Sequence, residues 1–185
     1  MGIPVQPVAT AAPAPDNIWV LGILGSASHP TWALAHWTGR WKVVRLPAPP
    51  SGESLNGYWV GWDNAHGAWV VVDQGPTVPG WLLLHWTGRR WIKIRYPYQT
   101  FGLGPMAHDG HGGLWIASDS CRSCIYTDMV HYNPARGWAK PMPAGPVAIE
   151  TMRLIPRTQS VWAAGIRSFG LHNPNGSAAI LKYGP

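Results

Sequence analysis

Charged side chains are scarce in this sequence. They make up 12% of its 185 residues, and only 8 residues are acidic against 14 Lys and Arg. Long surface helices need a polar face along their length, so few of them are expected. Gly (22), Pro (19) and Trp (13) are abundant instead, a balance that is typical of short strands joined by tight turns. The composition therefore predicts an all-β protein.

Long apolar runs are also missing. No stretch approaches the roughly 18 residues that a membrane helix needs, so no membrane span is expected. The sequence shows no signal peptide, which leaves the compartment open. The formal charge of +6 allows weak attraction to anionic polymers, but the basic residues form two short clusters and no long run. Nucleic acid is therefore not expected as a partner.

The two cysteines, Cys121 and Cys124, are too few for a four-cysteine zinc site within one chain. His108 and His111 lie near them in sequence, but the expected strand between the two segments would hold them about 17 to 20 Å apart. No metal site is therefore expected. A disulfide within the CxxC loop is the first interpretation, and a free dithiol or redox pair is the alternative.

The few acidic residues also offer no clear catalytic pair. Glycoside hydrolysis needs two carboxyl groups that converge in a cleft, yet Asp73 and Asp119 close equivalent strands of two repeats and so belong to the repeat pattern. No nucleophile elbow, phosphate loop or zinc-protease motif is present. We therefore expect no catalytic residues and no cofactor.

A repeated phrase dominates what is present. HWTGRW at residues 36–41 returns as HWTGRRW at 85–91 and more faintly as HYNPARGW at 131–138. A Trp series recurs with steps of 50, 46 and 47 residues, at Trp19, Trp69, Trp115 and Trp162. A second series has steps of 49, 46 and 51 residues, at His36, His85, His131 and Lys182. Series that share one period indicate one structural unit repeated four times.

Each repeat has four short apolar runs bounded by turn residues, which predicts four strands. In the second repeat these strands are expected at about Leu55 to Trp62, Ala68 to Asp73, Trp81 to Trp86 and Trp91 to Tyr96. Such units placed side by side are the signature of a β-propeller. The sequence predicts one β-propeller or half-propeller domain over residues 1–185, with repeats at about 5–50, 51–97, 98–144 and 145–185.

The repeated residues have a structural interpretation. Equivalent positions of different blades lie far apart, so the histidines are expected to bond a backbone group of their own blade. The four tryptophans of the Trp series are expected to fill the space between adjacent blades, because a large aromatic ring buries the most area there. HWTGRW is then the third strand, a turn and the start of the fourth strand.

The fourth repeat is incomplete in this sequence, because LKYGP has no counterpart of WKVVRLP or WIKIRYP after it. The last blade is therefore expected to lack its outer strand, which leaves an edge that can pair with another strand. Three interpretations stay open: a four-bladed ring with one open edge, a fragment of a longer chain, or a half-propeller. In the last case a homo-oligomer would complete about eight blades, and we favour this assembly or the fragment.

The pattern VWAxG, a variable loop, then HWxGxxWxxxxxP resembles the Trp-rich, broadly kelch-like propeller repeats of secreted and cell-surface proteins from actinobacteria and related bacteria. The resemblance covers the chain from about Val5 to Pro185 and lacks the WD40 and sialidase-like signatures. It implies a circular array of four-stranded blades that serves as an extracellular binding or sensor module. It also allows an oxidase or lyase, although no catalytic residues of such enzymes have counterparts here.

The variable loops between second and third strands are the candidate ligand site, since the scaffold already explains the repeated residues. Aromatic rings beside Arg and His donors suit sugars or anionic ligands. The candidate residues are His29, Trp32, Trp81, Arg122, Tyr126, Arg167, Phe169 and His172. We expect a non-enzymatic binding module for a glycan, a cell-wall component or a protein. The alternatives are a propeller enzyme and a self-assembling structural half-propeller.

Overall fold

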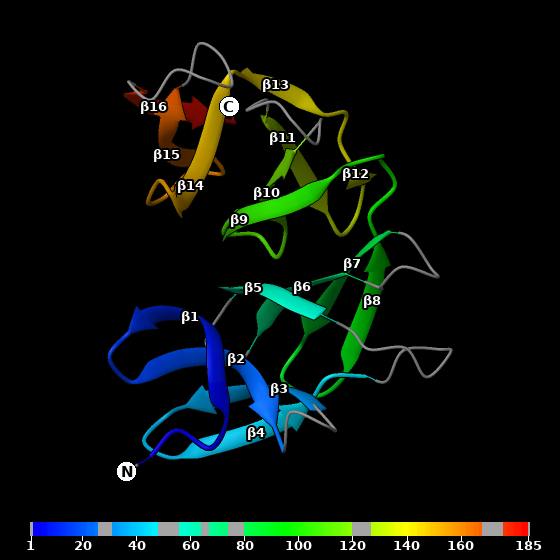
Figure 1. Cartoon of the computed structure of the whole chain (residues 1–185), viewed down its shortest axis with the longest axis vertical. Coiled ribbons are helices and arrows are strands. Elements are labelled where there is room, and N and C mark those ends of the chain that lie inside the picture. The colour runs from blue at the N-terminus through cyan, green and yellow to red at the C-terminus, as the bar shows by residue number, and fades with distance from the viewer. Residues whose placement is uncertain are drawn as a thin grey trace. The chain divides into compact units, whose positions relative to one another are not determined.

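The protein is all-β. The computed structural model describes residues 2–25, 31–47, 56–63, 67–73, 80–119, 127–167 and 176–184. These residues form strands β1 to β16, arranged in four antiparallel sheets (Figure 1). They contain no helix, in agreement with the expected fold class, and therefore none that is long and apolar enough to cross a membrane.

The first two sheets are regular four-stranded meanders, named blade 1 and blade 2. Blade 1 contains β1 (Gln6–Ala14), β2 (Asn17–Leu24), β3 (Thr31–Trp37) and β4 (Trp41–Arg45), paired in chain order. Blade 2 contains β5 (Asn56–Trp62), β6 (Ala68–Asp73), β7 (Trp81–Trp86) and β8 (Trp91–Arg95), also in chain order. The strands of the second repeat thus lie where the alternation of apolar runs and turn residues predicts them.

The other two sheets, blade 3 and blade 4, depart from this pattern at their outer strands. Blade 3 contains β9 (Gly102–His108), β10 (Leu114–Asp119), β11 (Thr127–Asn133), β12 (Gly137–Trp138) and β13 (Met142–Gly145). Both β12 and β13 pair with β11, so the outer strand is broken into two pieces. Blade 4 contains β14 (Val147–Leu154), β15 (Val161–Arg167) and β16 (Ser177–Tyr183). Its described residues form a three-stranded sheet, which confirms the missing outer strand.

The repeated phrase HWTGRW is the β3–β4 turn, as the sequence predicts. Gly39 and its equivalent Gly88 have φ values of 84° and 85°, in the region that residues with a Cβ avoid. In blade 2 the turn is closed by Thr87, whose backbone N–H and side-chain hydroxyl both donate to the carbonyl oxygen of Arg90. The phrase recurs because each of these hairpins needs the same turn chemistry.

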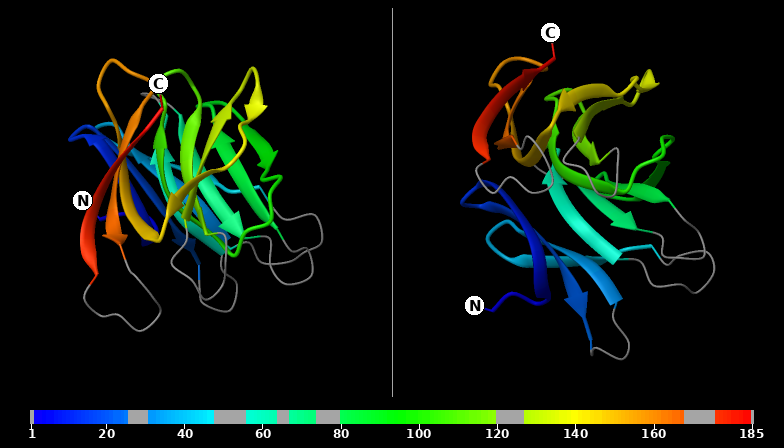
Figure 2. Two further views of the ribbon diagram at one scale, coloured as in Figure 1. Left: turned by 90° about the horizontal axis from the view of Figure 1, so that it is seen from above. Right: turned by 45° about the horizontal axis from the view of Figure 1, so that its top comes forward.

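The chain divides into two compact units, unit 1 at residues 1–96 and unit 2 at residues 97–185. Each unit contains two blades whose first strands lie against one another, β1 against β5 in unit 1 and β9 against β14 in unit 2. Figure 2 shows the antiparallel meander of each blade. Four blade repeats that stack face to face in pairs give the chain a β-propeller fold. Its organisation as a single domain stays a prediction.

Tryptophans of the second strands form the contact between stacked blades. Trp19 belongs to the core cluster between blades 1 and 2, and Trp115 to the cluster between blades 3 and 4. They are 1% and 4% exposed, so each removes most of a large aromatic surface from water. Trp162 of blade 4 differs: it is 48% exposed, because within unit 2 no following blade covers that face. The prediction of a buried role was therefore wrong for Trp162.

Candidate functional site

Each repeated histidine is held between a turn side chain and a tryptophan ring. In blade 2, His85 Nε2 lies 2.8 Å from Asp63 Oδ2, and the imidazole stacks on Trp69 with ring centroids 4.0 Å apart. In blade 3, His131 Nε2 lies 2.9 Å from Asp109 Oδ2, and its ring stacks on Trp115 at 4.5 Å. The structural role within one blade is confirmed. The predicted backbone partner was wrong, because the turn supplies a carboxylate.

Blade 1 carries a neutral version of this arrangement. His36 Nε2 lies 2.8 Å from Asn17 Oδ1, and the imidazole lies 3.6 Å from the Trp19 ring at an interplanar angle of 4°. An amide oxygen can accept the imidazole proton as a carboxylate does. The imidazole thus stacks on the indole whether its partner at the turn is a carboxylate or an amide.

The Asp109 carboxylate in blade 3 is buried and accepts several hydrogen bonds. Burial raises its pKa, but the backbone N–H groups of His111 and Gly113 and the side chain of His131 donate to it and outweigh burial. The pKa of Asp109 therefore lies below its ordinary value. Gly113 lies so close that a Cβ there would collide with the carboxylate, which explains the glycine at this position.

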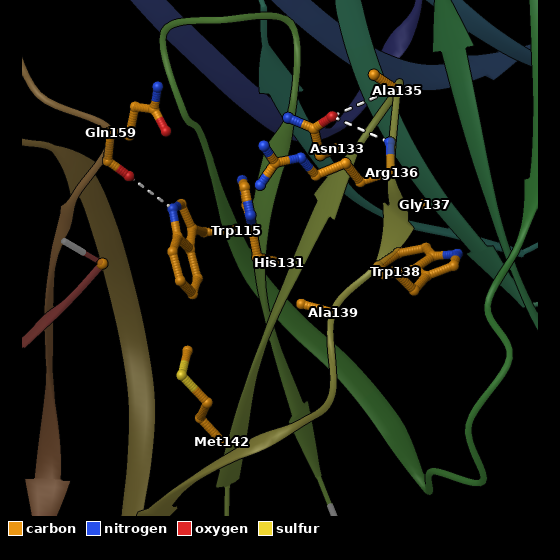
Figure 3. Close-up of a pocket in the computed structure, with 11 residues that line it drawn as sticks. Trp115, His131, Asn133, Ala135, Arg136, Gly137, Trp138, Ala139, Met142 and Gln159 are labelled. Atoms are coloured by element: carbon orange, nitrogen blue, oxygen red, sulfur yellow. Dashed lines mark hydrogen bonds between the residues drawn. The ribbon is translucent and has the colours of Figure 1, made fainter.

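A cavity of about 830 Å³ lies within unit 2, between the outer strands of blade 3 and the end of blade 4 (Figure 3). Blade 3 supplies the inner wall from β10 and β11, the rim from the β11–β12 turn, and the outer wall from β12 and β13. Blade 4 supplies the β14–β15 turn and the residue after β16. The lining residues are Trp115, His131, Asn133, Ala135, Arg136, Gly137, Trp138, Ala139, Met142, Gln159 and Gly184.

Hydrogen bonds fix the polar rim of this cavity. Asn133 Oδ1 accepts the backbone N–H groups of Ala135 and Arg136 at 2.9 and 3.2 Å, which holds the β11–β12 turn. From that turn the Arg136 side chain extends across the cavity towards Trp115 (Figure 3). Among the described residues its guanidinium forms no ion pair. The cavity thus presents one positive charge on a fixed turn.

Aromatic and aliphatic side chains form the cavity walls. The indole N–H of Trp115 donates to the carbonyl oxygen of Gln159 at 2.9 Å, which ties the β10 wall to blade 4. Met142 lies below Trp115, whereas the ring of the rim residue Trp138 points away from Trp115 (Figure 3). The Trp138 ring packs against Tyr132 with centroids 5.0 Å apart. A ring or an apolar side chain entering here would meet the Trp115 indole and the Met142 side chain.

The predicted loop site is described only in part. Trp32 and Trp81 lie in β3 and β7 of unit 1, and the Trp32 side chain packs against the core between blades 1 and 2. Arg167 ends β15 in unit 2 and is exposed. Outside the described residues lie His29, Cys121, Arg122, Cys124, Tyr126, Phe169 and His172. The shared loop face and the disulfide therefore stay predictions.

Sequence reasoning missed the cavity residues Asn133, Arg136 and Trp138. One signal was available: HYNPARGW has eight residues from its histidine to its last tryptophan, one more than HWTGRRW and two more than HWTGRW. This longer turn is the one that Asn133 organises and from which Arg136 projects. The departure from the repeat was thus more informative about ligand binding than the repeat itself.

No protein-family model matches the chain, and no curated protein matches it significantly. Within the described parts of the chain, no three His, Cys, Asp or Glu side chains gather as metal ligands. The case for a function therefore rests on the cavity and on the differences between blades.

Proposed function

We propose that the chain is a non-enzymatic binding module and that the cavity of unit 2 is its ligand site. The carrying observation is the joint presence of the Trp115 indole, the Met142 side chain and the Arg136 guanidinium around one space of about 830 Å³. Ligand pockets of proteins are concave and mostly apolar, with a few polar groups that set orientation, and they usually measure about 300 to 1,000 Å³. The cavity has this character.

The chemistry of the walls defines the ligand. Indole faces cover a flat apolar ring, either an aromatic side chain or the apolar face of a sugar. Arg136 adds a donor for a carbonyl or carboxylate oxygen, and it can also lie over an aromatic ring. The expected ligand therefore presents an apolar ring beside a hydrogen-bond acceptor. A protein ligand and an acidic glycan both offer this combination, and the strand pattern discussed below favours a protein.

A pair of small probes tests this proposal. N-acetyl-tryptophanamide represents a protein side chain and methyl β-D-glucuronide an acidic sugar, and binding is followed by ligand-observed NMR. We expect Arg136→Ala to weaken binding of the preferred probe by about tenfold, which corresponds to loss of roughly 1.4 kcal/mol of binding free energy. Arg40→Ala is the matched control, because Arg40 lies on the corresponding turn between β3 and β4 of blade 1.

Two results would count against the cavity as the ligand site. One is the absence of binding of both probes at millimolar concentration. The other is equal weakening by Arg136→Ala and by the control Arg40→Ala, because the effect would then reflect the loss of one positive charge anywhere on the protein. Preference for the sugar would retain the binding function and favour a glycan or cell-wall ligand.

Self-assembly is a second candidate function, supported by the open face of blade 4. Trp162, Ile166 and Ile180 are 48%, 50% and 73% exposed there, and exposed apolar groups of this size mark interaction surfaces. A second copy that packs on this face would form a homo-oligomer. Light scattering of the purified protein tests the idea: we expect a dimer mass that Ile180→Lys converts to the monomer mass, and a monomer at all concentrations would contradict it.

The kelch-like relationship, the bacterial origin and the extracellular location belong to the same proposal. They rest on the resemblance of the VWAxG and HWxGxxW patterns to repeats of secreted propeller proteins. The loop face of unit 1 that includes Trp32 and Trp81 is proposed as a second contact surface, and the exposed Arg167 of unit 2 as a separate one. Alanine at Trp81 that leaves all ligand binding unchanged would remove this loop face from the account.

A further inference from the structure

In unit 1, the outer strand of the second blade seals the space between the two blades. Its first residue, Trp91, donates its indole N–H to the carbonyl oxygen of Arg45 at the end of β4, at 2.9 Å. The Trp91 ring also packs against the core cluster that contains Trp19 and Leu46. A tryptophan at the start of one outer strand thus bridges from blade 2 to blade 1.

The corresponding place in unit 2 is the cavity. By position in the repeat, Trp115 is the equivalent of Trp19, and Met142 is the equivalent of Leu46, since each precedes the proline of its outer segment. Both Trp115 and Met142 line the cavity. The space that Trp91 fills in unit 1 is therefore the space lined by equivalent residues in unit 2.

The end of β16 shows the same difference. In blade 2, Trp86 at the end of β7 packs against Trp91 with ring centroids 5.3 Å apart. Tyr183 holds the position of Trp86 in blade 4, and it pairs with Val161 of β15. Among the described residues, no strand pairs with the other edge of β16. The next residue, Gly184, lines the cavity.

We infer that the cavity and the outer edge of β16 form one acceptor site for an extended segment of a partner polypeptide. The inference rests on the proposed function, since it names the partner class for the same cavity. The segment adds a fourth strand to blade 4 antiparallel to β16, and its first aromatic residue enters the cavity. Strand addition of this kind combines backbone hydrogen bonds for affinity with side-chain pockets for specificity.

The outer strands of unit 1 define the sequence that fits. In both β4 and β8 the half-buried residues are the first and the fourth, Trp41 and Val44 in one and Trp91 and Ile94 in the other. The register of blade 2 pairs Trp86 with Trp91 and Leu82 with Arg95. Transferred to blade 4, it places the aromatic residue opposite Tyr183 and the fifth residue opposite Ala179. The partner segment therefore carries Trp-x-x-Val or Trp-x-x-Ile.

A peptide with the β8 sequence tests the acceptor site directly. The probe is Gly-Arg-Arg-Trp-Ile-Lys-Ile-Arg-Tyr-Pro, residues 88–97 of this chain, added to the full chain in a calorimetric titration. We expect it to bind at least about tenfold more tightly than the same peptide with Trp91→Ala, because buried tryptophans dominate interface energies. A scrambled peptide of equal charge controls for electrostatic attraction, which is already disfavoured by the net charge of +6 on the protein.

The outcomes separate this inference from the proposed function. Equal binding of the Trp91→Ala peptide, or no peptide binding while N-acetyl-tryptophanamide still binds, would overturn the strand acceptor and leave the cavity as a small-ligand site. Failure of the peptide and of both small probes would overturn both. A dimer mass in light scattering that persists in Ile180→Lys and falls to the monomer mass in excess peptide would show that a second copy occupies the edge, which also contradicts a separate partner.

Discussion

Units 1 and 2 are built from the same repeat and differ at one end. Both stack their blades through a second-strand tryptophan, Trp19 in one unit and Trp115 in the other. In unit 1 the outer strand β8 closes the stack with Trp91. In unit 2 the equivalent space is a cavity bordered by Arg136 and Met142. The comparison teaches that the shared features are scaffold, and that function is to be sought where the second unit departs from the first.

The largest effect on stability is expected from the difference between the covered face of blade 3, at Trp115, and the open face of blade 4, at Trp162. Trp115→Ala should lower the free energy of unfolding by about 3 to 5 kcal/mol, because it empties a buried aromatic site. Trp162→Ala, at the equivalent position of blade 4, should cost less than about 1 kcal/mol, since the ring is already half exposed. Denaturant unfolding of both variants measures the difference. Similar costs for the two substitutions would mean that Trp162 is covered in solution.

The next largest effect on stability is expected at the Asp109 carboxylate of blade 3. Asn17 holds the corresponding position beside the histidine of blade 1. The pKa of Asp109 is lowered in the folded chain, so its contribution to stability is present above the pKa of the unfolded state and is lost as pH falls through the folded value. Asp109→Asn should cost roughly 1 to 3 kcal/mol at neutral pH, since one of the donors loses its acceptor. This loss of unfolding free energy should become smaller at acidic pH.

Unfolding measured between pH 7 and pH 3 checks this prediction. Asn17→Asp is the reciprocal control in unit 1 and should leave the fold intact, because blades 2 and 3 accommodate a carboxylate beside the same histidine. A cost of Asp109→Asn that stays constant over the whole pH range would show that the charge contributes nothing to stability.

The smallest effect is expected at Asp119, which ends β10 in the same blade. Burial raises its pKa, so the stabilising contribution of this group is present below the pKa of the unfolded state and is lost as pH rises through the folded value. Asp119→Asn should therefore raise the midpoint of thermal unfolding slightly at pH 7 and have no such effect in acid. A lowered midpoint at pH 7 would show that the charged form is stabilised by a partner.

The repeat made the blade structure predictable, because apolar runs and turn residues that are close in sequence determine the order of strands and turns within a repeat. The β8 strand begins at Trp91 as expected, and the missing outer strand of blade 4 follows from the comparison of LKYGP with HWTGRRW. The pairing of His85 with Asp63 was not predictable, since the two residues lie 22 positions apart and only the fold brings them together.

The candidate site was less accessible to sequence analysis for a related reason. Trp162 and Trp115 occur in similar local sequence, and only the presence or absence of a neighbouring blade decides which ring is buried. A cavity likewise depends on which segments of the folded chain leave a space unfilled, and no sequence motif encodes this. The aromatic loop residues drew attention because of their chemistry, whereas the cavity depends on the turn at Asn133 and on the open end of blade 4.

Hydrogen exchange of β16 tests the central claim most directly, namely that unit 2 offers an open place for a ligand that unit 1 fills itself. The amide exchange of residues 177–184 is measured with and without the β8 peptide, and residues 81–86 of β7 serve as the internal reference because β8 already pairs with them. The account predicts that peptide slows exchange in β16 and leaves β7 unchanged. Unchanged exchange in β16 at saturating peptide would contradict it.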